Sequence, residues 1–196
     1  PRLCTIHDIT IEDDFTTDAG LYKTMSIIKS SPKTIILASF PCTGGSPWNI
    51  GMNKSIPQCG EKLQHHEEEF TKLWLNFLKL LDQIGTIPII IEWPRCCSYW
   101  KREEVADTLM GLRTKTTNFD GCMYGIFDEA KLLPLKKQWR FATNSTAVRR
   151  MFDQMCSKGH EHAESTSTAL RNTQYYSPEM AVLLHVAIYY HFALPD

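Results

Sequence analysis

A cysteine and a glutamate each follow a predicted buried strand. Cys42 comes after the run Thr34–Ser39 by way of Phe40-Pro41, and Glu92 ends an apolar run that begins at Ile87. Both runs are continuously apolar, as is typical of central strands buried on both faces. In open α/β sheets, ligands bind outside the carboxyl ends of the strands. The order therefore predicts a thiol and a carboxylate within about 10 Å of each other, the scale of a ligand pocket.

Each of these side chains also has an ordinary structural interpretation. Cysteine is one of the most frequently buried residue types, so Cys42 could be a small apolar core residue. Glu92 could be a capping or ion-pairing carboxylate. Their occurrence together, in this order, favours chemistry for the pair. A reactive thiolate needs a positive neighbour, and Arg95 and Arg140 are the candidates, although Arg140 could equally be a surface residue.

A second group of side chains carries the donor atoms of a metal site. Cys156 is followed by His160 and His162, and Cys122 lies upstream. Two sulfurs and two imidazole nitrogens form a ligand set that zinc accepts. The spacing is not that of a familiar zinc finger, and the alternative is a set of unligated cysteines and loop histidines. If zinc is present, we expect it to bind Cys122, Cys156 and one or both histidines.

Alternating helix and strand patterns are expected to position these residues. A helix capped by Thr16 or Thr17 precedes the first strand, and a strongly amphipathic helix carrying Phe70 to Ile84 ends at Gly85. This second helix should connect the two strands, which we expect to be parallel and adjacent. The density of glycine and proline from Phe40 to Gly60 predicts a long loop.

The rest of the chain continues the alternation. We expect a short helix with Val105, a strand near 116–119, antiparallel strands at 122–127 and 139–143, a helix around Val148 and a final apolar helix from Pro178. Together the patterns predict one α/β domain over residues 1–196, with helices covering a sheet. No repeats or low-complexity tracts interrupt it.

The succession of motifs resembles the cytosine-5 DNA methyltransferases. Phe40-Pro41-Cys42-Thr43 is similar to the proline-cysteine loop that carries their nucleophile. Ile91-Glu92-Trp93-Pro94-Arg95 is similar to their glutamate strand, with Trp where Asn is usual. Three further segments look like methyltransferase-like proteins of phages and eukaryotic mobile elements: Phe119–Gly125, Lys136–Asn144, and Cys156 with His160-Glu161-His162-Ala163. The resemblance covers nearly the whole chain.

This resemblance implies a Rossmann-like methyltransferase core: a mostly parallel sheet with helices on both faces and an antiparallel C-terminal edge. It also implies transfer of a methyl group from S-adenosylmethionine to cytosine in DNA. The Cys42 thiolate would add to the ring of a flipped base, Glu92 would hydrogen-bond a ring nitrogen, and Arg140 would lie on the basic strand.

The start of the chain departs from the family. Its glycine-rich turn, which holds the methyl donor, has no counterpart before Thr34. We assign Asp8 and Pro41 to a cofactor pocket, and the alternative for Asp8 is a solvated acidic loop. We therefore expect the isolated chain to bind S-adenosylmethionine weakly or not at all.

Charge and composition limit the partners. With 21 Lys and Arg against 22 Asp and Glu, no whole-molecule field attracts a phosphate backbone. DNA, or alternatively RNA, would bind locally through Thr43–Gly60 with Lys136, Lys137 and Arg140. The sequence has no membrane-spanning run, no signal-peptide pattern from Pro1 to Asp8, and an odd number of cysteines, seven. We expect an intracellular protein, nuclear or cytoplasmic, with reduced thiols.

Three functions remain open at this point. The chain could be a DNA cytosine-5 methyltransferase core, or an inactive methyltransferase-like module that binds nucleic acid or protein for a mobile element. The third is a zinc-stabilised interaction domain. The missing glycine-rich turn favours the second over the first.

Overall fold

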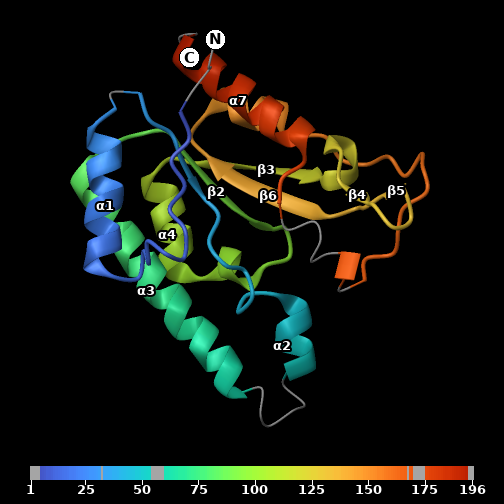
Figure 1. Ribbon diagram of the computed structural model, residues 1–196, viewed down its shortest axis with the longest axis horizontal. Helices are drawn as coiled ribbons and strands as arrows, with labels where there is room; N and C mark the ends of the chain where they lie inside the picture. The colour runs from blue at the N-terminus through green and yellow to red at the C-terminus, as the bar shows by residue number, and fades with distance from the viewer. Residues whose placement is uncertain (1–4, 32, 54–59, 167, 170–174, 194–196) are drawn as a thin grey trace. The chain divides into compact units, whose positions relative to one another are not determined.

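A four-stranded sheet has the strand order β1-β2-β6-β3, and Figure 1 labels β2, β3 and β6 of this sheet. The computed structural model describes residues 5–193 except 32, 54–59, 167 and 170–174. The sheet strands are β1 (Ile36–Ala38), β2 (Ile89–Pro94), β3 (Lys115–Asp120) and β6 (Gln138–Thr143). A separate two-stranded sheet pairs β4 (Phe127–Asp128) with β5 (Leu133–Pro134).

The predicted Rossmann-like, mostly parallel sheet is wrong. β6 is antiparallel to both of its neighbours, with Phe141 opposite Glu92 of β2 and Thr117 of β3. Among the described strands only β1 and β2 form a parallel pair. The expected antiparallel C-terminal edge is likewise wrong, because β6 lies between two other strands. An apolar run indicates a strand buried on both faces, and such strands occur in parallel sheets and in covered antiparallel sheets alike.

The helices begin and end at the residues that local chemistry favours. α1 (Asp18–Lys29) is capped by Thr17, whose side chain accepts from the Gly20 amide, and α3 (Gly60–Ile84) ends before Gly85 at φ +68°. Both helices are confirmed. The predicted long loop is wrong in part, because α2 (Pro47–Asn53) interrupts it. Proline is favourable in the first turn of a helix.

The chain divides into two units that alternate along the sequence. Unit 1 contains Ile90–Arg95 and the chain from Thr114 onward, whereas unit 2 contains Thr5–Ile89 and Cys96–Arg113. β2 therefore begins at the last residue of one unit 2 segment and continues in unit 1. A single domain over 1–196 stays a prediction.

Unit 1 is built around an aromatic cluster on one face of β3 and β6. The ring centroids of Phe119 and Phe141 are 4.7 Å apart, and both rings contact Phe152, which stacks on Tyr124. Two helices pack together in this unit, α5 (Thr146–Met151) and α7 (Pro178–Ala193), and α5 also packs on β6. In Figure 1, α7 runs alongside β3 and β6.

The segment after β3 departs from the predicted strand at 122–127. It forms a 3₁₀ helix, η3 (Gly121–Tyr124), followed by a left-handed turn at Gly125 with φ +75°. Glycine has access to this conformation without steric cost, and the turn ends the extended chain. The remaining residues enter β4, which pairs with β5 and not with β6.

Unit 2 packs α1 and α2 against α3. Its other elements are β1, η2 (Ser98–Lys101) and α4 (Glu103–Gly111). The Tyr99 ring of η2 stacks on Phe70 of α3 with centroids 3.9 Å apart, and the Arg102 guanidinium lies over both rings. Within the described chain, no helix is long and apolar enough to cross a bilayer.

Candidate metal centre

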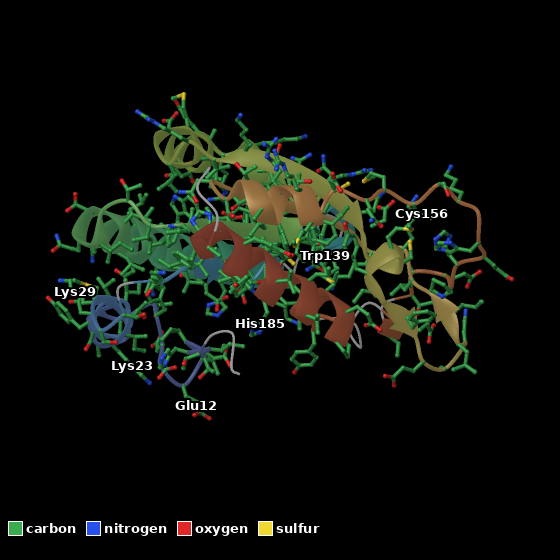
Figure 2. All side chains as sticks on the ribbon, turned by 90° about the horizontal axis from the view of Figure 1, so that it is seen from above. Glu12, Lys23, Lys29, Trp139, Cys156 and His185 are labelled. Atoms are coloured by element: carbon green, nitrogen blue, oxygen red, sulfur yellow. The ribbon has the colours of Figure 1, made fainter. Side chains whose placement is uncertain are left out.

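Four donor side chains of unit 1 converge on one point. The ligand atoms of Cys122, Cys156, His160 and His162 all lie within 4.8 Å of one another. His162 Nε2 is 3.4 Å from the Sγ atoms of both Cys122 and Cys156, and His160 Nε2 is 3.8 Å from Cys156 Sγ. Figure 2 shows Cys156 on the segment that follows α5. The predicted metal-binding set is thus brought together by the fold.

η3 presents Cys122 to the cluster. β3 ends at Asp120, and the Gly121 amide then donates to the Lys137 carbonyl at 2.7 Å. The Ile126 amide closes the following turn onto the Gly121 carbonyl at 3.1 Å. These bonds fix the backbone on both sides of Cys122, which is half-buried.

The second part of the cluster comes from the irregular segment Phe152–Ala163. The Tyr124 hydroxyl donates to the Met151 carbonyl at 3.1 Å and accepts from the Gln154 amide at 3.0 Å. At the far end, the Ala163 amide donates to the Pro134 carbonyl at 2.9 Å. Hydrogen bonds therefore anchor the segment before and after its three ligands.

A left-handed turn brings the histidines back toward Cys156. Lys158 has φ +63°, and its amide donates to Cys156 Sγ at 3.2 Å. The two imidazoles then lie with ring centroids 4.5 Å apart. Residues 157–161 are exposed, so apolar burial does little to hold this turn.

Burial controls the protonation of the cluster. It raises the pKa of the Cys122 thiol to about 12, and the contact with Cys156 acts in the same direction. Burial also lowers the pKa of His162, helped by the neighbouring His160. A neutral imidazole is the form that binds a metal, and the lowered pKa favours this form of His162 at neutral pH. The cluster could hold a metal ion once Cys122 has lost its proton.

The predicted catalytic residues Glu92 and Arg140 point to opposite faces of the sheet. Glu92 lies opposite Phe141 and Arg140 opposite Trp93, and side chains alternate between faces along a strand. The buried Glu92 carboxylate accepts from the Tyr176 hydroxyl at 3.4 Å. Arg140 donates through Nε to Asn118 Oδ1 at 2.8 Å. The structure therefore does not bring these two side chains together.

Cys42 belongs to unit 2, so its predicted proximity to Glu92 stays a prediction. Its carbonyl accepts from the Gly45 amide at 3.1 Å in a turn, and its thiol is half-buried. Asp8 and Pro41, assigned to a cofactor pocket, are both exposed. Their role likewise stays a prediction.

The sequence did not predict that the turn at Gly44 and Gly45 packs closely on another side chain. The turn packs on the buried Tyr99, and Gly45 accepts from the Ser98 amide at 2.8 Å. Burial raises the pKa of the Tyr99 phenol, and the charges of Cys97 and Cys42 add to the effect. The double glycine was the available signal, because it permits a close approach of backbone to another group.

Comparison with protein-family models, curated proteins and solved structures finds no match for this chain.

Proposed function

We propose that this chain is a zinc-stabilised, non-catalytic binding module. The observation that carries the proposal is the convergence of Cys122, Cys156, His160 and His162 within 4.8 Å. Two thiolates and two imidazoles suit tetrahedral zinc, and calcium or magnesium would prefer oxygen ligands. Four protein ligands leave no open position for water or substrate, which defines a structural zinc site.

The metal would join two parts of unit 1 that are distant in sequence. Cys122 lies on η3, and the other three ligands lie on the segment 152–163. This segment contributes few buried side chains between Cys156 and Ala163, so a bound ion supplies order that apolar packing does not. On binding, each thiol would release its proton to solvent as it becomes a thiolate ligand, and His162 would coordinate through Nε2, which already faces both sulfurs.

The proposed partner is nucleic acid. Basic side chains flank the metal-binding segment: Arg149 and Arg150 lie in the last turn of α5, and Lys158 lies between the ligands. Lys137 lies over the buried Trp139 ring at 4.6 Å, a cation–π contact that fixes the position of a further positive charge in the same unit. Because the net charge of the chain is −1, binding must be local and should weaken steeply with salt.

The proposal is tested by metal content and by binding. Elemental analysis of protein purified without chelator should give one zinc per chain, and Cys156→Ser should lose it while Cys96→Ser retains it. Fluorescence anisotropy with duplex and single-stranded oligonucleotides should show an affinity that depends on zinc. This affinity should fall as the salt concentration is raised from about 50 to about 200 mM. Zinc-free protein of unchanged stability would refute the module, and zinc-loaded protein without affinity would refute the partner.

Cytosine methylation is the second candidate, and the buried Glu92 supports it. This carboxylate lies on the strand that resembles the methyltransferase glutamate strand and is held by Tyr176. A methyl-transfer assay with tritiated S-adenosylmethionine should compare the chain with Cys42→Ser on duplex and single-stranded DNA. Our primary proposal expects no incorporation. Incorporation that disappears in the variant would establish the enzyme and overturn the non-catalytic assignment.

A further inference from the structure

We infer that Asp120 is a positioning residue of the metal centre, which it prepares by fixing the backbone of Cys156. The inference rests on the proposed zinc site and concerns how that site reaches its geometry. Asp120 ends β3 two residues before Cys122, and its side chain is fully buried. Asp120 is therefore near Cys122 in the sequence and in contact with Cys156, which is distant in the sequence.

Two hydrogen bonds connect Asp120 to the metal-binding segment. Its Oδ2 accepts from the Cys156 amide at 2.9 Å, and its own amide donates to the Gln154 carbonyl at 3.1 Å. The hydrogen bond to the Cys156 amide restrains the backbone nitrogen that is bonded to the Cα of this ligand. Metal ligands must reach their distances within about 0.2 Å, so this restraint acts on the position of Sγ.

The charge of Asp120 is arranged in a way that fold stability alone does not require. A buried carboxylate costs free energy unless it is paired, and here Lys136 Nζ lies 3.4 Å from Oδ2. The other oxygen, Oδ1, is buried and makes no hydrogen bond among the described residues. An apolar side chain would fill this place at lower cost. What it would not do is accept from the Cys156 amide.

Carboxylates in this outer position are known to tune metal sites. Removing an outer-shell hydrogen-bond partner typically weakens metal affinity by about 10–100-fold. Asp120 and Lys136 form a neutral pair, so both can be replaced together without leaving a buried charge. Asn and Leu have nearly the same shape, and only Asn offers an acceptor.

The experiment compares two double variants that differ in that acceptor. We expect Asp120→Leu with Lys136→Met to bind zinc about 10–100-fold more weakly than the unmutated chain in a chelator competition. Asp120→Asn with Lys136→Met should restore most of that affinity. Circular dichroism verifies the fold, and the cobalt(II) absorption spectrum reports ligand geometry, which a merely structural role would not change selectively. Equal affinities and equal cobalt spectra in the two variants would overturn the inference.

A measurement on the unmutated chain covers the case in which the leucine variant does not fold. In the zinc-loaded protein, NMR should detect a coupling through the hydrogen bond from the Cys156 amide nitrogen to the Asp120 carboxylate carbon. Its absence would overturn the inference. Absence of zinc from the unmutated chain would instead refute the proposed zinc site, so the two failures are distinguishable.

Discussion

Removing zinc should destabilise unit 1 by several kcal/mol. Between the anchors at Gln154 and Ala163 the metal-binding segment is largely exposed, so the bound ion is its main cross-link to η3. An ion present at 1,000 times its dissociation constant, and bound only by the folded state, adds about 4 kcal/mol. In a chain of this size each kcal/mol moves the melting midpoint by about 2–4 °C, which predicts a fall of about 8–16 °C.

The assay is thermal unfolding followed by tryptophan fluorescence, with and without a zinc chelator. Cys156→Ser should reproduce the effect of the chelator, and the chelator should then change this variant no further. Cys96→Ser, at an exposed cysteine outside the cluster, is the matched control and should behave as the unmutated chain does. Hydrogen exchange should place the loss of protection in Phe152–Ala163. A midpoint that is indifferent to chelation would refute the reasoning.

Two further predictions follow from protonation and from packing. Because the pKa of metal-free Cys122 is raised to about 12, its thiol is protonated at neutral pH and loses that proton to zinc. Each thiol that becomes a thiolate ligand releases one proton, so zinc affinity in a chelator competition should rise by at least about tenfold per pH unit between pH 7 and 9 and fall toward acid. A flat profile would contradict this protonation. Gly45→Ala should cost about 1–3 kcal/mol in urea denaturation, since a Cβ would lie 2.5 Å from Cys97 Sγ and 3.0 Å from the Tyr99 ring. The control is Gly51→Ala, where nothing lies within 4 Å of the new Cβ, so the helix should tolerate it; equal effects at both sites would count against the packing argument.

Elements with a local signal were predictable from the sequence. Thr17 supplies a cap and Gly85 a left-handed stop, and both act within one turn of the helix they bound. Burial of Ile89 to Ile91 was likewise visible as an apolar run. The direction of the partner strand was not predictable, because a continuous apolar run is found in strands buried on both faces whether the sheet is parallel or antiparallel.

The metal ligands were predictable by type, whereas the contacts that position them were not. Cysteine and histidine are common metal ligands, so Cys122 and His162 could be proposed from the sequence as members of one metal site. Asp120 and Lys136 carry no pattern that links them to each other or to Cys156. Their roles depend on where η3 turns and where the segment after α5 returns. Both of these are set by tertiary packing.

The central place of β6 has a consequence for synthesis on the ribosome. β2 and β3 leave the ribosome before β6, yet both pair with it. At about 5–20 residues per second, Gln138 follows Pro94 by about 2–9 s. During that interval the nascent chain presents an apolar strand edge at Ile90 and Ile91 with its later partner still unmade. Chaperones that recognise extended apolar segments should therefore engage this chain before β6 emerges, and release it once the strand has paired.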